Sequence, residues 1–440
     1  MDDETFTNLL QTVIFNQFHE TSREPEGLDY LLAREGRWQQ PGTEIGELIT
    51  EIVEGADDRI GDHYREALSE RHGFEAVRDG GEDPFAEDAL YEEAPIDSGE
   101  HGRSWHRFKI DVLARSRYYN RDADTALDGL FGDLHDMRTR DGQPVVRTIG
   151  PDSPDRFFYR ARIAQSRASL ETILKTPVPE LGPPPPIAAT AGRMNAHGIS
   201  VFYGATDVDT CISEVRPPVG SQAVIGRFEI IRALSVLDVS ALASCYSNGS
   251  RFDPNSLERW QKEQFLRKLV GEISRPVQPH EESAEYLPTQ VVAEYLHDRP
   301  NPRLDGMLFP SSQQGGQNLV LFHRAAKVES DDLPRNTRFW ISWGYGPPDD
   351  FTEDIEVHED VPPEPAIPEG ARVIDLDFGL PRDFLALPGA REPEADEREA
   401  SLRLDRESVQ VHGVQQVRYI THEREVGYRR GVRRDDDVPF

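Results

Sequence analysis

Apolar residues recur at helical spacing through the first third of the chain. Two segments show the i, i+3, i+4, i+7 pattern of an amphipathic helix: Phe6, Leu9, Leu10 and Val13, and then Ile45, Leu48, Ile49 and Ile52. Between residues 79 and 102 the chain is acidic and has no period, which predicts a loop.

Two further helices are predicted after this acidic segment. Ser104 is a suitable N-cap for the first, which places Trp105, Phe108 and Val112 on one face. The second carries one apolar stripe, made of Leu127, Leu130, Phe131 and Leu134. We therefore expect residues 1–148 to form an all-helical N-terminal domain.

From residue 157 onward, short apolar runs predict strands. Residues 157–162, 222–230 and 234–240 have this character, and residues 305–322 predict a strand, a Pro-Ser-Ser turn, a Gly-rich loop and a second strand. A long helix with Leu266, Leu269, Val270 and Ile273 lies between them. It is followed by a helix that has Pro288 in its first turn. This order predicts a mixed α+β domain over residues 149–330.

The last 110 residues carry weaker patterns. Residues 339–350 and 362–370 are rich in turn formers and predict loops, whereas residues 408–420 predict a two-stranded ribbon that turns at His412 and Gly413. Residues 331–440 are therefore expected to form a C-terminal extension of strands and loops.

The stretch from residue 191 to residue 219 brings polar side chains close to a predicted strand. Alternating Ile199, Val201 and Tyr203 predict the strand, and a short helix beginning at Asp207 or Asp209 carries Glu214. Arg193 precedes the strand. From the pattern alone, Glu214 is more simply a solvated helix residue and Tyr203 a core aromatic. Arg193 is either a surface ion-pair partner or an anion clamp.

The charge balance is strongly acidic. The formal net charge is −31, from 80 Asp and Glu against 49 Lys and Arg, of which only five are Lys. Nucleic acid and anionic membranes are disfavoured as partners because they repel such a surface. Many acidic residues with few Lys are typical of salt-in halophiles. The net charge is therefore better explained as an adaptation to a cytoplasm of high salt concentration than as a feature that binds a substrate.

Other compositional features favour a cytoplasmic protein. Cys211 and Cys245 are the only cysteines and lack metal-type spacing, which suits a reducing compartment. The N-terminus does not resemble a signal peptide, and no stretch approaches the ~18 apolar residues of a spanning helix. Dinucleotide-fold, P-loop and zinc-hydrolase motifs are absent, and no metal site is expected.

Several motifs together resemble the RES domain family, which takes its name from Arg, Glu and Ser residues. They are GRMNAHGISVFYGATDVDTCISEVRP (192–217), QAVIGRFEI (222–230), LSVLDVS (234–240), PTQVVAEYL (288–296) and DGMLFPSSQQGGQNLVLF (305–322). The resemblance spans roughly residues 155–328. SWHRFKIDVLARSRYYN (104–120) and the following LFGDL resemble, more loosely, the HEPN-like domain fused to some RES proteins.

The resemblance implies a fold related to the ADP-ribosyltransferase toxins, and an enzyme that consumes NAD as a substrate rather than holding it as a cofactor. Carried over residue by residue, the catalytic set is Arg193, Tyr203, Glu214 and Ser311, with Arg160 and Asn318 as substrate-binding residues. Phe309 stands where Tyr is common and Cys211 where Ala is usual. Neither departure removes a functional group that the chemistry needs.

The expected activity is an NAD phosphorylase or glycohydrolase that serves as a toxin or defence effector, with phosphate as a candidate co-substrate. Three alternatives stay open: a mono-ADP-ribosyltransferase with a protein target, a HEPN-type RNA-acting protein, and a non-catalytic binding module. Against the second, Arg59 and His63 are too closely spaced for a HEPN motif. The family resemblance also implies an antitoxin protein as a partner. The sequence does not determine the oligomeric state.

Overall fold

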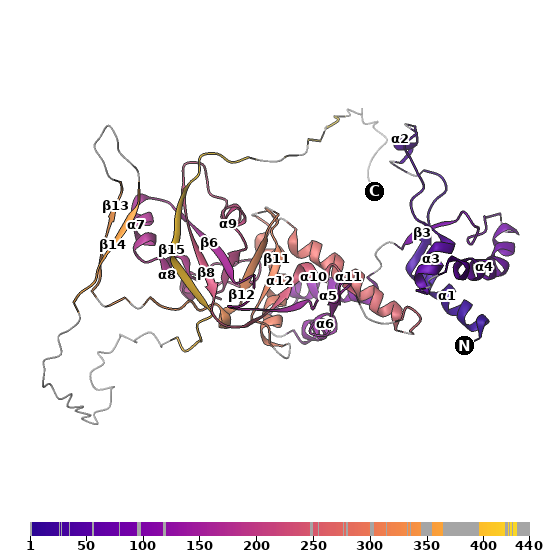
Figure 1. Cartoon of the computed structure of the whole chain (residues 1–440), viewed down its shortest axis with the longest axis horizontal. Coiled ribbons are helices and arrows are strands. Elements are labelled where there is room, and N and C mark those ends of the chain that lie inside the picture. The colour runs from indigo at the N-terminus through magenta and orange to yellow at the C-terminus, as the bar shows by residue number, and fades with distance from the viewer. Residues whose placement is uncertain are drawn as a thin grey trace, which may run out of the picture.

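An eight-stranded mixed sheet forms the centre of the molecule (Figure 1). The computed structural model describes residues 2–344 apart from short gaps, residues 354–363 and 396–418, and a few positions between 421 and 428. The strand order is β15-β8-β6-β7-β12-β11-β9-β5, and neighbours are antiparallel except for the parallel pair β11 and β9. The strands are β5 (Val146–Ile149), β6 (Phe157–Ala164), β7 (Phe202–Ala205), β8 (Gln222–Ile230), β9 (Leu234–Asp238), β11 (Gly306–Pro310), β12 (Gln317–Leu321) and β15 (Leu402–Gly413).

Helices cover both faces of this sheet. Alternation along the strands separates two cores, since Met307 and Val320 belong to one and Leu308 and Leu319 to the other. The first core packs against α5 (Gly99–Ala114), α6 (Arg121–Phe131), α10 (Val239–Leu242), α11 (Ser256–Ser274) and α12 (Glu282–Asp298). The second packs against α7 (Arg167–Lys175) and α8 (Pro177–Leu181).

The remaining elements are smaller. A separate core at the N-terminal end joins α1 (Asp3–Gln17), β1 (Phe18–Glu20), α3 (Ile45–Ile52), α4 (Asp58–Arg78) and β3 (Leu90–Glu93). Strand β2 (Thr43–Glu44) pairs with β3, and α2 (Asp29–Arg34) lies apart from this core (Figure 1). Elsewhere lie α9 (Val208–Val215), the pair β4 (Arg138–Thr139) and β10 (Cys245–Tyr246), the pair β13 (Arg338–Ser342) and β14 (Glu356–Asp360), and the short 3₁₀ turns Pro186–Ala188 and His323–Ala325.

The predicted α+β class is confirmed, but the expectation that residues 1–148 are all helical is wrong. Strands β1, β3 and β2 form a small sheet there, and β5 belongs to the main sheet. Helices α5 and α6 pack against α11 and α12 rather than against the N-terminal core. The hydrophobic cores therefore separate the chain near the start of α5. Sequence periodicity finds helices but not the partners they bury against.

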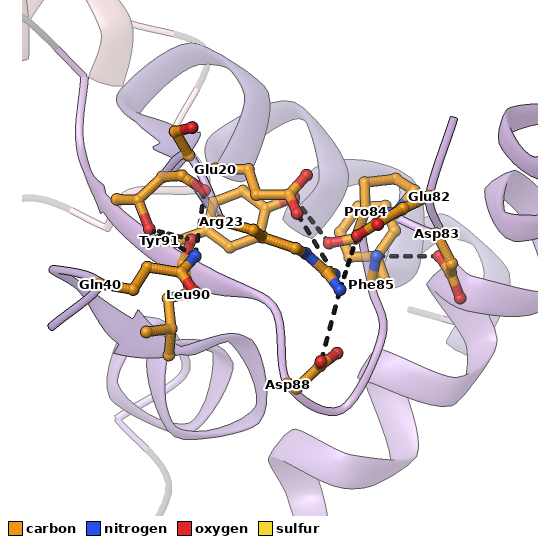
Figure 2. Close-up of polar contacts among 12 residues, drawn as sticks. Glu20, Arg23, Gln40, Glu82, Asp83, Pro84, Phe85, Asp88, Leu90 and Tyr91 are labelled. Carbon is orange, nitrogen blue, oxygen red and sulfur yellow. Dashed lines mark hydrogen bonds and ion pairs between the residues drawn. The ribbon is translucent and has the colours of Figure 1, made fainter. Parts of the chain in front are cut away.

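The acidic segment that predicted a loop is ordered where the structure describes it. Phe85 and Tyr91 are buried in the N-terminal core, and residues 90–93 of the segment form β3. Arg23 holds the segment by ion pairs to Glu82 at 2.6 Å and Asp88 at 3.3 Å (Figure 2). Two apolar anchors and one shared cation fix a stretch whose composition alone predicts disorder.

Three helix and strand boundaries differ from the predictions. Helix α5 begins at Gly99, so Ser104 lies inside it rather than capping it. Helix α12 begins at Glu282, which makes Pro288 an internal residue. Strand β7 begins only at Phe202, and Ile199 is exposed. Alternation along a loop can imitate a strand, because a strand also requires a hydrogen-bonded neighbour.

One strand of the C-terminal extension, β15, belongs to the main sheet. Residues 339–342, predicted as loop, belong to β13, which pairs with β14. Residues 408–413 of the predicted ribbon instead belong to one strand, β15, which pairs antiparallel with β8 apart from an irregularity between Asp405 and Gln410. Residues 345–350 and 364–370 of the predicted loops, and residues 419–420 of the predicted ribbon, lie outside the described residues.

Strand β15 should contribute strongly to stability because it buries Leu402 in the sheet core. We expect Leu402→Ala to lower the free energy of unfolding by about 2–5 kcal/mol through lost burial and the cavity left behind. Arg403→Ala, which removes only a surface ion pair to Glu329, should cost less than about 1 kcal/mol. Urea denaturation of both variants measures this. If Leu402→Ala lowered the free energy of unfolding by as little as is expected for Arg403→Ala, β15 would not be integral to the fold.

Candidate active site

The predicted site residues meet at one cavity of about 390 Å³. It opens beside the sheet where β6, β7 and β12 meet α9 and where α11 ends and α12 begins. Five of the six predicted residues line it: Arg160, Arg193, Tyr203, Glu214 and Asn318. The sixth, Ser311, contacts the Glu214 carboxylate. Side chains from five separate segments thus converge on one volume.

Described side chains donate hydrogen bonds to one oxygen of the Glu214 carboxylate, Oε1. Ser311 Oγ donates a hydrogen bond to Glu214 Oε1 at 2.6 Å, and Asn318 Nδ2 donates to the same oxygen at 2.8 Å. Within the described part of the chain, Oε2 has no hydrogen bond. One carboxylate oxygen is therefore fixed by the protein, and the other remains available to a ligand.

Close packing of Gly316 against the first turn of α9 positions the Glu214 carboxylate beside Ser311 and Asn318. Asp207 caps α9 by accepting from the backbone N–H of Thr210 at 2.8 Å. Gly316 lies directly against this first turn, since a Cβ there would come within 2.1 Å of Thr210 Oγ1. Strand β12 begins at the next residue, Gln317. The lack of a side chain at residue 316 therefore lets the segment that carries Ser311 and Asn318 dock against the helix that carries Glu214.

The hydroxyl of Tyr203 is hydrogen-bonded to other groups of the protein. The hydroxyl donates to Asn195 Oδ1 at 2.9 Å and accepts from the backbone N–H of Met194 at 3.0 Å. Burial raises the pKa of Tyr203, so the phenol is neutral near pH 7. Asn195 is itself buried and donates to the backbone carbonyl of Thr190 at 2.9 Å. Tyr203 therefore fixes the turn that carries Arg193.

Arg193 closes the end of α11. Its guanidinium donates to the carbonyl oxygen of Ile273, and to that of Arg275 at 2.8 Å, and it lies 5.2 Å from the ring centre of Tyr286. The cation thus sits at the negative end of a helix dipole. It still lines the cavity, so it combines a structural contact with an exposed charge.

Two residues of α12 that the sequence reasoning did not single out support the same turn. Thr289 Oγ1 donates to the carbonyl oxygen of Arg193 at 2.7 Å, and Gln290 Nε2 donates to that of Gly192 at 2.8 Å. Both side chains are buried although they are polar. Adjacent polar residues at the buried positions of a helix were the signal that could have identified them.

Arg160 brings a charge into the cavity wall. Its guanidinium donates to the carbonyl oxygen of Tyr203 at 3.2 Å and lies 5.4 Å from the ring centre of Phe202. Burial lowers its pKa to about 10, which leaves it charged at pH 7. No carboxylate pairs with it among the residues that the structure describes. A cation without a counter-charge is a natural contact for an anionic ligand.

Other candidate chemistries find less support here. Burial raises the pKa of the cavity-lining Cys211 thiol to about 12, so it is not a ready nucleophile. Arg59 pairs with Asp57, and His63 lies 3.1 Å from Asp3, so each is engaged with its own acid. No metal-binding cluster of His, Cys, Asp and Glu occurs in the described ranges. No described helix is both long and apolar enough to cross a membrane.

A comparison with protein families finds a match over the region of the chain that holds this cavity. Searches of curated proteins and of solved structures found no significant match. A family model, that of the RES domain, matches residues 158–343, which run from β6 to just past β13. All six predicted site residues fall inside this range. Residues 158–343 are therefore similar to the RES domain family, and the described residues that line the cavity lie within this matched region.

Proposed function

We propose that this protein cleaves the nicotinamide–ribose bond of NAD, with phosphate or water as the acceptor. The observation that carries the proposal is the carboxylate of Glu214, braced on one oxygen and open on the other, in a cavity that also presents Arg160. The cavity volume of about 390 Å³ falls in the range of small-molecule sites. The RES domain match supports NAD as the substrate.

Cleavage of the nicotinamide–ribose bond requires few catalytic groups from the protein. Nicotinamide carries its positive charge in the substrate and leaves as a neutral base, so no general acid has to protonate it. The bond electrons move to the ring nitrogen while positive charge develops on the ribose, as in glycoside cleavage. Glu214 Oε2 would stabilise that charge and bind the ribose hydroxyls. The acceptor then bonds to the anomeric carbon and releases one proton, which Glu214 can accept.

The arginines would bind the anionic part of the reaction. Arg160 provides an unpaired guanidinium suited to phosphoryl oxygens, and Arg193 provides a second one at the cavity wall. Ser311 and Asn318 orient the carboxylate rather than the substrate. We further propose that NAD depletion makes the protein a toxin or defence effector, held in check by an antitoxin protein.

Replacing Glu214 by Gln tests the carboxylate directly. An amide keeps an oxygen that can accept from Ser311 and Asn318, so the substitution changes mainly the free atom. We expect NAD turnover to fall by about 10²–10³-fold, which corresponds to roughly 3–4 kcal/mol of transition-state stabilisation. Mass spectrometry of products formed with and without phosphate measures turnover and identifies the acceptor.

The matched control is Glu285→Gln, an exposed carboxylate on α12 that does not line the cavity. Turnover near the wild-type level in Glu214→Gln would remove the carboxylate from the mechanism. A mass increase on protein, in place of free ADP-ribose products, would identify a protein ADP-ribosyltransferase instead.

Tyr203→Phe separates positioning from contact with substrate. Loss of the hydroxyl leaves a backbone N–H and Asn195 Oδ1 without this partner, so the free energy of unfolding should fall by about 1–3 kcal/mol. Because the turn also carries Arg193, KM for NAD should rise while kcat falls less than in Glu214→Gln. Urea denaturation and steady-state kinetics give both readouts. A large loss of kcat at unchanged stability would place the hydroxyl on the substrate.

Arg160→Met should dissociate stability from activity. The buried guanidinium has no described carboxylate partner, so an apolar side chain of similar length relieves its desolvation. We expect the free energy of unfolding to be unchanged or higher and kcat/KM for NAD to fall at least about tenfold. A destabilised variant with normal kcat/KM would assign Arg160 a structural role.

A further inference from the structure

Arg216 has a backbone conformation that ordinarily belongs to glycine. It is the C-cap of α9, with φ 47° and ψ 56° in the left-handed region. Among the described residues only Glu54 and Asn336 are other non-glycine residues with positive φ. An L side chain at such a position destabilises the fold relative to glycine. Strain of this kind, observed at a cavity, is a reason to look for a role of the side chain.

The side chain of Arg216 lines the same cavity as Glu214, which lies two residues earlier. No ion pair or hydrogen bond engages its guanidinium in the part of the chain that the structure describes. This is unexpected in a protein with 80 acidic and 49 basic residues. Elsewhere on the main sheet arginines are neutralised, as Arg162 is by Glu180 and Arg227 by Asp405.

Arg216 and Arg193 face the same part of the cavity. Burial and the neighbouring Glu282 raise the pKa of Tyr286, while the positive charges of Arg193 and Arg216 oppose that rise. Arg193 lies 5.2 Å from the ring centre of Tyr286, and Arg193, Arg216 and Tyr286 all line this one cavity. Arg160 lies on the β6 side. Three arginines, none in an ion pair with a described carboxylate, thus line the same cavity as the carboxylates of Glu214 and Glu282.

We infer that Arg216 binds a phosphoryl group of the ligand, as a third arginine beside Arg160 and Arg193. The inference rests on the proposed NAD-cleaving function, because it assigns that site's anionic ligand. The phosphoryl group belongs either to the diphosphate of the dinucleotide or to free phosphate that attacks the ribose. A planar guanidinium recognises the paired oxygens of both.

Arg216→Gly provides the sharpest test, because glycine relieves the backbone strain while removing the side chain. We expect a Tm equal to or higher than that of the wild type. Calorimetric titration should show weaker binding of ADP, of inorganic phosphate, or of both, by about 10–100-fold, the loss typical of a charged hydrogen bond. Adenosine, which has no phosphoryl group, should bind equally to both proteins. Weaker ADP binding alone assigns Arg216 to the diphosphate, and weaker phosphate binding alone assigns it to the free acceptor.

Two controls separate backbone from charge. Glu54→Gly places glycine at another position of positive φ, in the N-terminal unit, and should leave ADP and phosphate binding unchanged. Arg103→Ala removes an exposed arginine that pairs with Glu100 on α5, and it should also leave binding unchanged. Arg216→Lys keeps the charge without the planar fork and should lose less affinity than Arg216→Gly, which covers the case in which the glycine variant fails to fold.

Wild-type affinity of Arg216→Gly for both ADP and phosphate would overturn the inference, as would a wild-type protein that binds neither. These results are distinct from failure of the proposed function. A protein that binds ADP or phosphate through Arg216 but leaves NAD intact would refute NAD cleavage and keep the anion site. A protein that cleaves NAD equally well with or without Arg216 would do the reverse.

Discussion

The antiparallel pairing of β7 with β12 is the contact on which the site depends. Its register places Asn318 opposite Ala205 and Val320 opposite Tyr203. Because α9 follows β7 after a short turn, the same register brings Glu214 to Asn318 and to Ser311 at the end of β11. A shift of one residue would turn Asn318 to the other face of the sheet and leave the carboxylate without its brace.

The second constraint is electrostatic. The chain is acidic overall, yet the cavity in front of Glu214 is lined by arginines that no described carboxylate neutralises. Arg193 is partly stabilised by the carbonyl oxygens at the end of α11, and Arg160 by a carbonyl and an aromatic face. These neutral partners hold the cations in place without cancelling their charge. An anionic ligand can therefore gain the full interaction.

The parts of the chain that flank the region matched by the RES model are joined to that region in different ways. The C-terminal β15 extends the main sheet, so at least this part of the tail is structural. Helices α5 and α6 complete the core under α11 and α12, although they precede the matched region. The N-terminal unit has its own core and meets the rest mainly through α1 and α11. Arg193 donates hydrogen bonds to carbonyl oxygens at the C-terminal end of α11. This one helix therefore connects the N-terminal unit with the wall of the cavity.

Local patterns in the sequence determined much of this structure. The strands β6, β8, β9, β11 and β12, the cap of α9 at Asp207 and the apolar stripe of α11 were all predictable, because such features depend on neighbours along the chain. Family resemblance suggested the six candidate residues, five of which line one cavity while the sixth contacts Glu214. Tertiary structure decided which oxygen of Glu214 is held, what the Tyr203 hydroxyl binds, and where Arg193 docks. It also decided that β15 pairs with β8, about 180 residues away in the chain. These contacts join distant segments, and an amino-acid pattern specifies that a polar group or strand edge needs a partner without specifying which partner it finds.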